Sequence, residues 1–305
     1  MIEHLTLQHL QSEAELFLKE LIRTPSVSRE EAGTAAVIEN YLNKYRISFE
    51  RNFNNIWAKN RFFDPALPTI LLNSHHDTVK PNSSYTIDPF SALEKDGKIF
   101  GLGSNDAGAS LVGLWATFVW FYDKKLNYNL VYTATAEEEI SGEHGIRSIL
   151  MDLPPVDFAI VGEPTQMNLA VAEKGLVVLD CRVQGTASHA AHPNADNSIY
   201  KALTEIEKVQ HLEFDRVSDV LGKVKATVTV INAGSAHNVV PDHLDFVVDV
   251  RTNEHYTNAE IVEIFRKELS CTVQPRSLLL NSSKIPLNHP IVMAAKAEGS
   301  ELYGS

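Results

Sequence analysis

A short apolar run that ends in a polar cluster, Leu71–Asp77 (LLNSHHD), constrains this chain more than any other stretch. Thr69–Leu72 has the composition of a buried strand, and such a strand delivers polar side chains at its C-terminal end. Because side chains alternate along a strand, His75 and Asp77 are predicted to face one way and His76 the other. A carboxylate beside a histidine fixes its tautomer, which is a common way to build a metal ligand. Taken alone, the same residues could equally be solvated side chains in a loop.

Alternating helices and strands fill the first part of the chain. The predicted elements are helices over 10–22, 31–45 and 143–150, an extended segment over 47–57, strands over 129–135 and 158–161, and a helix of about five turns after the glycine-rich loop at Gly101. Because polar residues follow several of these strands, the order predicts an α/β fold with a site at the C-terminal ends of the strands.

The pattern changes near Lys174. From there the predicted order is strand 176–183, helix 197–211, strands 225–232 and 244–251, helix 258–269 and strand 272–279. This β-α-β-β-α-β order is that of a ferredoxin-like domain. We therefore predict a first domain over 1–174, an inserted domain over 175–282, and a return to the first domain over 283–305, with a helix over 289–303.

Composition excludes several functional classes. The net charge of -12 argues against a nucleic-acid partner, which requires a basic face. The two cysteines, Cys181 and Cys271, lack the spacing of a thiolate metal site. No apolar run reaches the roughly 18 residues that a membrane span needs. The N-terminus lacks the basic start and apolar core of a signal peptide, so we expect a cytoplasmic protein with no membrane partner.

Polar residues at four strand or loop ends are candidates for one site. They are His75 and Asp77, Asp106, Glu138 and Glu139, and Glu163. Each has an ordinary explanation, as a helix N-cap, a solvated glutamate run or a turn residue. Several carboxylates gathered at one sheet edge would repel one another without a cation. A histidine with carboxylates and no cysteine suits zinc, cobalt or manganese.

Six segments together resemble the zinc-dependent amidohydrolase and metallopeptidase family that includes acetylornithine deacetylase, succinyl-diaminopimelate desuccinylase, aminoacylase and glutamate carboxypeptidase. The segments, in order, are SHHDTV, GLGSNDAG, TAEEEISG, VGEPT, GTASHAAHP and INAGSAHNVVPD. The resemblance covers nearly the whole chain. It implies a mixed-sheet α/β metallopeptidase-like catalytic domain with an inserted ferredoxin-like domain that forms a homodimer through 175–282.

The resemblance also implies a site with two zinc ions, for which cobalt is a possible substitute. His75 and Glu163 resemble ligands of the first metal, and Glu139 resembles a ligand of the second. Asp106 resembles the carboxylate that bridges both metals. The family often has a cis peptide before this aspartate, here between Asn105 and Asp106.

The resemblance places the catalytic base in the run of three glutamates. Thr135-Ala136-Glu137 matches the family's Thr-Ala-Asp, which places the base at Glu138 and leaves a slip of one residue open. Asp77 resembles the residue that orients His75 from behind.

Three residues of the inserted domain also match family positions. His189 resembles the histidine that stabilises the oxyanion from the partner subunit, which requires a dimer. Asn238 and Arg251 match substrate-binding positions, and Arg251 would bind a substrate carboxylate through its fork. A surface histidine and a structural ion pair are the ordinary alternatives for His189 and Arg251.

The resemblance breaks down near Ser305. The family continues with a second-metal histidine and a substrate loop, and His289 fits the start of a helix instead, so we expect the second metal site to be incomplete in this chain. Either the C-terminal part of a longer enzyme is missing here, or the full-length protein binds one metal well and the other poorly. The implied reaction is hydrolysis of the amide of an N-acyl amino acid, first of all N2-acetyl-L-ornithine to L-ornithine and acetate, in arginine biosynthesis. The alternatives are a succinyl-ornithine or succinyl-diaminopimelate desuccinylase, or a non-catalytic truncated homologue.

Overall fold

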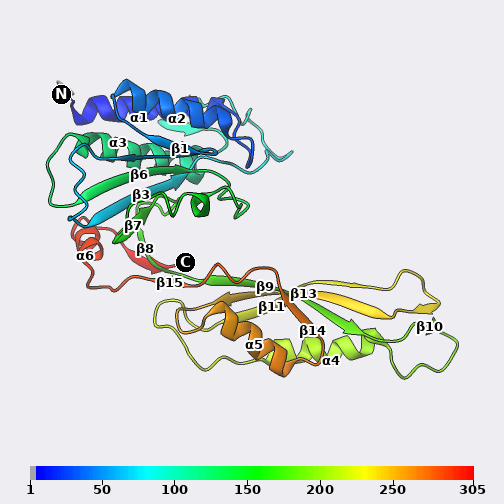
Figure 1. Cartoon of the computed structure of the whole chain (residues 1–305). Coiled ribbons are helices and arrows are strands. Elements are labelled where there is room, and N and C mark those ends of the chain that lie inside the picture. The colour runs from blue at the N-terminus through cyan, green and yellow to red at the C-terminus, as the bar shows by residue number, and fades with distance from the viewer. Residues whose placement is uncertain (1–4) are drawn as a thin grey trace. The chain divides into compact units, whose positions relative to one another are not determined.

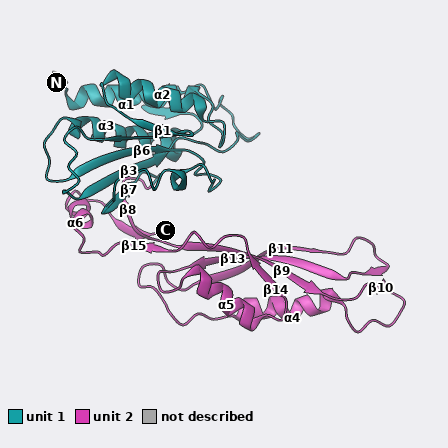
Figure 2. Ribbon diagram, viewed as in Figure 1, with its two compact units in different colours: residues 1–164 teal, residues 165–305 magenta. Residues whose placement is uncertain are grey.

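Two sheets, each with its own hydrophobic core, organise the chain. The computed structural model describes residues 5–305, which divide into a first unit ending at Pro164 and a second unit beginning at Thr165 (Figure 2). The core of the first unit surrounds the fully buried Trp115, and that of the second surrounds Phe246. Among the described residues, no helix combines the length and apolarity that crossing a bilayer requires.

A five-stranded mixed sheet with the order β1-β2-β6-β3-β7 forms the centre of the first unit. Its strands are β1 (Glu50–Asn52), β2 (Asn55–Lys59), β3 (Thr69–His75), β6 (Asn129–Thr135) and β7 (Phe158–Val161). β6 and β7 both run parallel to β3, so these three strands end at the same edge. The predicted bounds of β6 and β7 are confirmed. The extended segment over 47–57 is a hairpin, in which Phe53 turns with a left-handed φ of 52°.

Helices α1 (Leu7–Arg23), α2 (Ala32–Lys44) and α3 (Ser110–Tyr122) lie against this sheet (Figure 1). A hairpin of β4 (Leu93–Lys95) and β5 (Lys98–Phe100) precedes a π-helical segment, η1 (Ser104–Ala109), which runs into α3. α3 has 13 residues, fewer than the predicted five turns, because the backbone leaves helical geometry at Asp106 and Ala107.

The helix predicted over 143–150 is wrong. Only the 3₁₀ turn η2 (Ile146–Ser148) forms there. Gly142 precedes the segment and Gly145 lies within it, and glycine is a poor helix former because it loses much backbone entropy on folding. The backbone N–H of Gly142 instead donates to the carbonyl of Glu137 at 2.9 Å, which folds the segment back on the glutamate loop.

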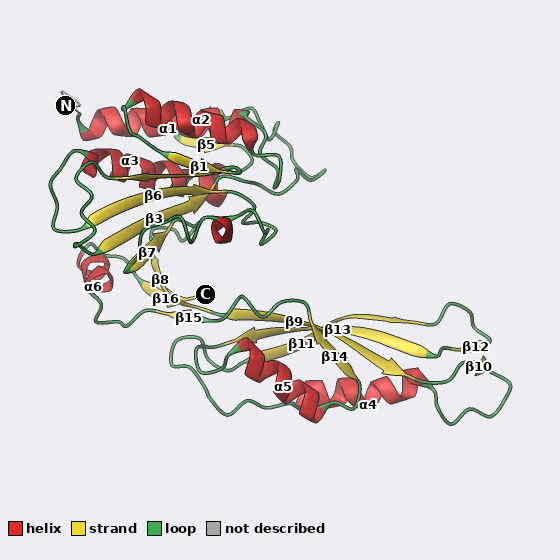
Figure 3. Cartoon of the chain, viewed as in Figure 1, coloured by secondary structure: helices red, strands yellow, loops and turns green. Residues whose placement is uncertain are grey.

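A four-stranded antiparallel sheet with the order β11-β13-β9-β14 forms the core of the second unit. Its elements, in chain order, are β9 (Gly175–Gln184), α4 (Ser198–His211), β11 (Lys225–Ala233), β13 (His243–Thr252), α5 (Asn258–Glu268) and β14 (Thr272–Pro275). Both helices lie on one face of the sheet (Figure 3). This is the predicted β-α-β-β-α-β order. β14 ends four residues early, at Pro275, which has no N–H to continue the ladder.

Two smaller sheets complete the second unit. One consists of β15 (Ser283–Lys284), β8 (Leu169–Glu173) and β16 (Leu302–Gly304), and the other of β10 (Ser188–His189) and β12 (Val239–Val240). The helix predicted over 289–303 is wrong in its last third: α6 (Pro290–Ala297) ends before Gly299, whose φ of 91° is left-handed. Residues 302–304 then pair in parallel with β8.

Candidate metal centre

The parallel strands of the first unit bring their C-terminal residues together. His75 is the last residue of β3, Glu138 and Glu139 follow β6, and Glu163 follows β7. Asp106 comes from η1, which contacts β3. Polar groups at the carboxyl ends of adjacent parallel strands are the usual location of a site in an α/β sheet.

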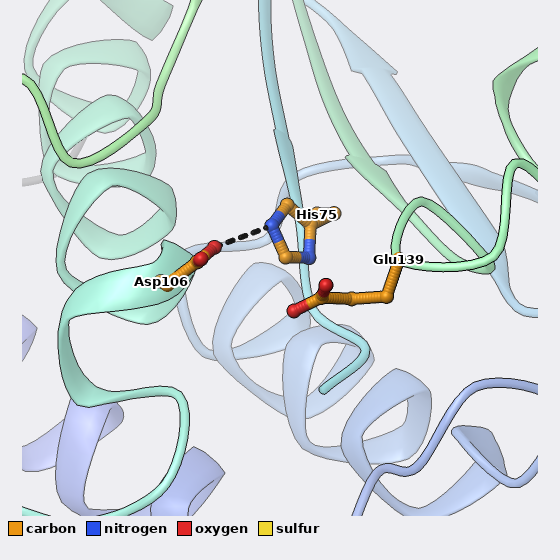
Figure 4. Close-up of side chains that lie close together, drawn as sticks. All are labelled: His75, Asp106 and Glu139. Carbon is orange, nitrogen blue, oxygen red and sulfur yellow. Dashed lines mark hydrogen bonds and ion pairs between the residues drawn. The ribbon is translucent and has the colours of Figure 1, made fainter. Parts of the chain in front are cut away.

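His75 lies at the centre of this cluster. Its Nε2 and Asp106 Oδ1 are hydrogen-bonded at 3.0 Å (Figure 4). One ligand atom each from His75, Asp106 and Glu139 lies within 4.8 Å of the other two. Glu138 Oε2 and Glu163 Oε2 each lie 3.9 Å from the same Nε2. All five predicted residues therefore surround one point, with the imidazole buried and the carboxylates partly open to solvent.

Asp77 is fully buried behind His75. The His75 Nδ1–H donates to the backbone carbonyl of Asp77 at 3.0 Å, and the Asp77 carboxylate lies 3.4 Å from Nδ1. That arrangement turns Nε2 toward the carboxylates. The Asp77 carboxylate also accepts the backbone N–H groups of Glu138 at 3.0 Å and Glu139 at 3.2 Å. One side chain thus contacts both the histidine and the glutamate loop.

His76 faces away from the cluster, as the alternation along β3 predicts. Its Nε2 lies 2.9 Å from the carbonyl of Asn54, and its Nδ1 lies 2.8 Å from Thr34 Oγ1. Burial lowers the pKa of His76 below its usual range, so the ring is neutral at neutral pH. In that form Nε2–H donates to Asn54 and Nδ1 accepts from Thr34.

Burial and, after it, the crowding of negative charge shift the pKa values of the cluster. Burial, together with the charges of Glu138, Asp106 and Glu139, raises the pKa of Glu163 to about 7 against the opposing effect of His75. Burial and Asp106 also raise the pKa of Glu139. Burial by itself would lower the pKa of His75, but Asp77 and the nearby glutamates raise it to about 9.

These residues fit a divalent metal ion. The donor set is one imidazole nitrogen and several carboxylate oxygens, which zinc and related ions accept. No lysine or arginine is hydrogen-bonded or ion-paired to the His75, Asp106 or Glu139 side chains among the described residues. A bound cation would relieve the repulsion that raises the pKa of Glu163.

The candidate residues of the second unit lie in a different setting. His189 in β10 pairs with Val239 in β12, and the neighbouring Ala190 N–H donates to the carbonyl of Asn238 at 2.9 Å. His189 and Asn238 are thus brought together at one exposed ribbon. Arg251 lies in β13, where its guanidinium binds both carboxylate oxygens of Asp249 at 2.9 and 3.2 Å.

Two features of the first unit differ from expectation. The cis peptide joins Asp106 to Ala107, one bond after the predicted position, where the chain leaves helical geometry. The segment 26–31 between α1 and α2 also contacts the site, and sequence analysis assigned it no role. Within it, the Ser28 hydroxyl donates to Asp77 Oδ2 at 2.7 Å. The sequence feature that could have drawn attention to this segment is the pair Ser28 and Glu31, three residues apart before α2.

Comparisons with known proteins identify the family of this chain. Residues 71–297, more than half of the chain, match the model of Peptidase family M20/M25/M40. A succinyl-diaminopimelate desuccinylase from Wolbachia pipientis is 24% identical over 286 residues, covering 87% of this chain and 71% of that protein. A protein of the same name from Pelagibacter ubique is 28% identical over 278 residues, covering 82% of this chain and 71% of that protein.

A solved structure shares the fold. It is a dinuclear metal binding peptidase of the M20 family from Bacillus subtilis, with a TM-score of 0.72 and 16% identity, covering 98% of this chain and 83% of that one. Its agreement extends over both units of the present chain. The chain belongs to peptidase family M20/M25/M40, and this membership confirms the expected class of enzyme, a metal-dependent amidohydrolase.

Proposed function

We propose that this chain hydrolyses the amide bond of an N-acyl amino acid with the help of zinc or cobalt. One observation carries the proposal: His75 Nε2 lies within 4 Å of carboxylate oxygens of Asp106, Glu138 and Glu163. Glu139 joins His75 and Asp106 in one compact donor group. The similar peptidase from Bacillus subtilis is described as dinuclear and metal binding, which supports a metal-dependent reaction at this cluster.

The donor groups divide into two overlapping sets in this proposal. His75, Asp106 and Glu163 would hold the first metal, and Asp106 and Glu139 would hold the second. Metal bound there supplies Lewis-acid activation of water and of the amide carbonyl. The His75 Nδ1–H donates to the backbone carbonyl of Asp77, which leaves Nε2 available for a metal.

Glu138 is the proposed general base. Its side chain is about half exposed, so a water molecule can reach it, and its Oε2 lies 3.9 Å from His75 Nε2. The Glu138 carboxylate takes a proton from the attacking water, whose oxygen bonds to the amide carbon. The same carboxyl then gives that proton to the amide nitrogen as the carbon–nitrogen bond breaks. The products are a carboxylic acid and a free amine.

The second unit contributes in this proposal through a homodimer. Its edge strand β11 is nine residues long and exposes Val230 and Ile231, which suits pairing with a second copy about a twofold axis. The partner subunit's His189 would donate a hydrogen bond to the oxyanion that forms on the amide oxygen. Asn238 and Arg251 would bind the substrate, and the guanidinium of Arg251 would bind the substrate's carboxylate.

Two observations bear on the acyl group. Several relatives are named succinyl-diaminopimelate desuccinylase, and N-succinyl-diaminopimelate is therefore the first substrate to test. The segment GSNDAGASL, in which many members have a lysine before the second glycine, resembles acetylornithine deacetylases. N2-acetyl-L-ornithine is the second substrate to test, and N2-succinyl-ornithine is the third.

The experiment measures amine release from each of these three amides, with the protein supplied with zinc or cobalt. We expect turnover of one or more, lost on chelation and restored by added metal. The metal content of the purified chain is measured in parallel. Metal bound at His75 but no turnover of any of the three would reject the proposed substrate class. Absence of both metal and turnover would favour the non-catalytic homologue.

A further inference from the structure

Three consecutive backbone N–H groups of the glutamate loop are held by two buried carboxylates. Glu137 N–H donates to Glu31 Oε1 at 3.4 Å. The next two, of Glu138 and Glu139, donate to the two oxygens of Asp77. The backbone that carries the proposed base and metal ligand is therefore fixed at every residue of the run.

Glu31 is fully buried, and the described contacts of its carboxylate are all to hydrogen-bond donors. Besides Glu137 N–H, Oε1 accepts Arg29 N–H at 2.5 Å, and Oε2 accepts the Asn54 Nδ2–H at 2.9 Å. A buried carboxylate is stable only where such donors compensate for its lost hydration. Removing it would leave three donors without their acceptor.

Ser28 reaches the same loop through Asp77, since its hydroxyl donates to the Oδ2 that also accepts Glu139 N–H. The segment is held in place by the backbone beyond β3. Ser28 N–H donates to the Thr78 carbonyl at 3.2 Å, and Thr78 N–H donates to the Ser26 carbonyl at 2.8 Å. Ser28 and Glu31 thus approach the loop from one rigid strap, defined here as residues 26–31.

His76 lies between Thr34 of α2 and Asn54 of the β1–β2 turn. Thr34 Oγ1 lies 3.0 Å from the Glu31 carbonyl and 2.8 Å from His76 Nδ1, and His76 Nε2 lies 2.9 Å from the Asn54 carbonyl. Asn54 returns to Glu31 through its side-chain amide. The second histidine of the HHD run therefore connects α2 to the β1–β2 turn, whose Asn54 binds Glu31.

The side chain of Glu137 turns away from the metal centre. Its φ of 55° is left-handed, its carboxylate lies 3.4 Å from His144 Nδ1, and Oε2 accepts the His144 N–H at 3.3 Å. A Cβ on Gly142 would lie 1.9 Å from Glu137 Oε2, so only glycine fits there. The loop places Glu137 on one side, and Glu138 and Glu139 on the other.

We propose that Ser28 and Glu31 are positioning residues that hold the Glu137–Glu139 backbone so that Glu138 reaches the attacking water. This inference rests on the proposed function, in which Glu138 is the base. Groups that orient the residues of a metal centre act over one hydrogen bond, and their removal typically costs about 10- to 100-fold in activity or metal affinity.

The test compares four variants by kcat, KM and cobalt affinity. Glu31→Met removes the acceptor at similar size, and we expect kcat to fall about 10- to 100-fold with KM changed by less than about twofold. Glu31→Gln keeps one side-chain oxygen that can accept the N–H groups of Arg29 and Glu137, so its kcat should be close to that of the natural protein. Ser28→Ala should lower kcat by about threefold to tenfold. Glu30→Gln, an exposed carboxylate beside Glu31, is the matched control and should change none of the three.

A double variant separates positioning from a general loss of folded protein. If Glu31 acts through Glu138, Glu31→Met should add no further loss to the residual rate of Glu138→Gln. An equal loss in both backgrounds would overturn the proposal, as would unchanged kcat in both Glu31→Met and Ser28→Ala. Should Glu31→Met fail to fold, Ser28→Ala decides, because it removes one hydroxyl from a partly exposed position.

Cobalt titration tests the positioning role independently of the proposed function, because it does not require turnover. If the natural protein hydrolyses none of the three amides, the proposed function fails, but the strap still positions the loop that carries Glu139, Ser28 through Asp77 and Glu31 through the Glu137 N–H. Ser28→Ala and Glu31→Met should then weaken cobalt binding about tenfold. Unchanged affinity in both variants would overturn the positioning role.

Discussion

The two regions that carry candidate chemistry are built in opposite ways. In the first unit, His75 is 1% exposed, and its neighbours come from strand ends that a parallel sheet brings together. In the second unit, His189 is exposed on the two-stranded β10–β12 ribbon, where its Nδ1 accepts the N–H of Ala191 two residues away. One histidine is oriented by a buried network, and the other only by its own ribbon.

In the proposed function, this difference means that the first unit can bind metal by itself, whereas the residues of the β10–β12 ribbon need a second protein surface to act on. The first unit brings together a donor set that fits a metal ion, with the proposed base Glu138 beside it. The ribbon of the second unit presents polar groups without a site of its own, which fits residues that complete a site elsewhere. Substitutions in the two regions should therefore differ in size and in their dependence on assembly.

The largest effect is expected at Glu138. Glu138→Gln removes the proton acceptor and should lower kcat by about 10²- to 10⁴-fold, with metal content unchanged, because the glutamine keeps the backbone contact to Asp77. Glu139→Gln should instead lower the metal content, since Glu139 belongs to the donor group with His75 and Asp106. Steady-state kinetics and metal analysis of both variants check the assignment. If the two variants exchange behaviour, the register of base and ligand is shifted by one residue.

The next effect tests whether the ribbon acts across subunits. His189→Ala should lower kcat by about 10²- to 10³-fold, the usual cost of an oxyanion donor, and leave metal content unchanged. Mixing it with Glu138→Gln should restore part of the activity, because a mixed dimer contains one intact composite site. The measurement is activity against mixing ratio after subunit exchange. A mixture as inactive as either parent, with exchange verified, would argue that His189 acts within its own chain or not at all.

The predictable part of this fold follows from local patterns. β6 was predictable because a buried strand is rich in apolar residues, and β7 because its four residues, FAIV, are all apolar although the strand lies at the sheet edge and is partly exposed. The convergence of His75, Glu138 and Glu163 was predictable because parallel strands end at one edge. β16 was not, since residues 302–304 become a strand only by pairing with β8, a contact between segments more than 130 residues apart.

The strap could not be predicted for a different reason. Ser28 and Glu31 have the spacing of a helix-capping box, which is the interpretation that local rules favour before α2. In the structure Glu31 is the N-cap residue of α2 but makes no side-chain cap, and both side chains contact groups far along the chain. Such contacts depend on how β3 and β6 lie beside the strap, which no pattern within 26–31 encodes.

A smaller effect tests substrate binding by the second unit. Arg251 and Arg182 each form a two-bond fork with an aspartate on the sheet, Arg251 with Asp249 and Arg182 with Asp245. If Arg251 also binds a substrate carboxylate, Arg251→Gln should raise KM about tenfold with kcat little changed. Arg182→Gln is the matched control, and its KM should equal that of the natural protein. Equal KM values for the two variants would leave Arg251 with a structural ion pair only.

The smallest expected effect is on stability and concerns Glu254, a carboxylate of the second unit that is paired with a lysine, unlike the crowded carboxylates of the first unit. Glu254 is mostly buried, and its Oε1 accepts Lys284 Nζ and Ser218 Oγ, each at 2.8 Å. Burial raises the pKa of Glu254, but the hydrogen bonds from Lys284 and Ser218 outweigh it and hold the pKa below the usual 4.5. Glu163, crowded by other acids, shifts the opposite way.

The sign of the pH dependence follows from this shift. The folded state binds fewer protons at Glu254 than the unfolded state, so the pair stabilises the protein above pH 4.5 and its contribution is lost as the pH falls through the lower folded value. Lys284 is one-third exposed, so solvent screens the pair and Glu254→Gln should cost no more than about 1 kcal/mol at pH 7. That corresponds to a fall of about 3 °C in Tm. The difference in Tm between the two proteins should shrink below pH 4.5, and Lys284→Met should behave alike. A difference that grows on acidification would mean that Glu254 is stabilised by its neighbours in the protonated form, as Glu163 is.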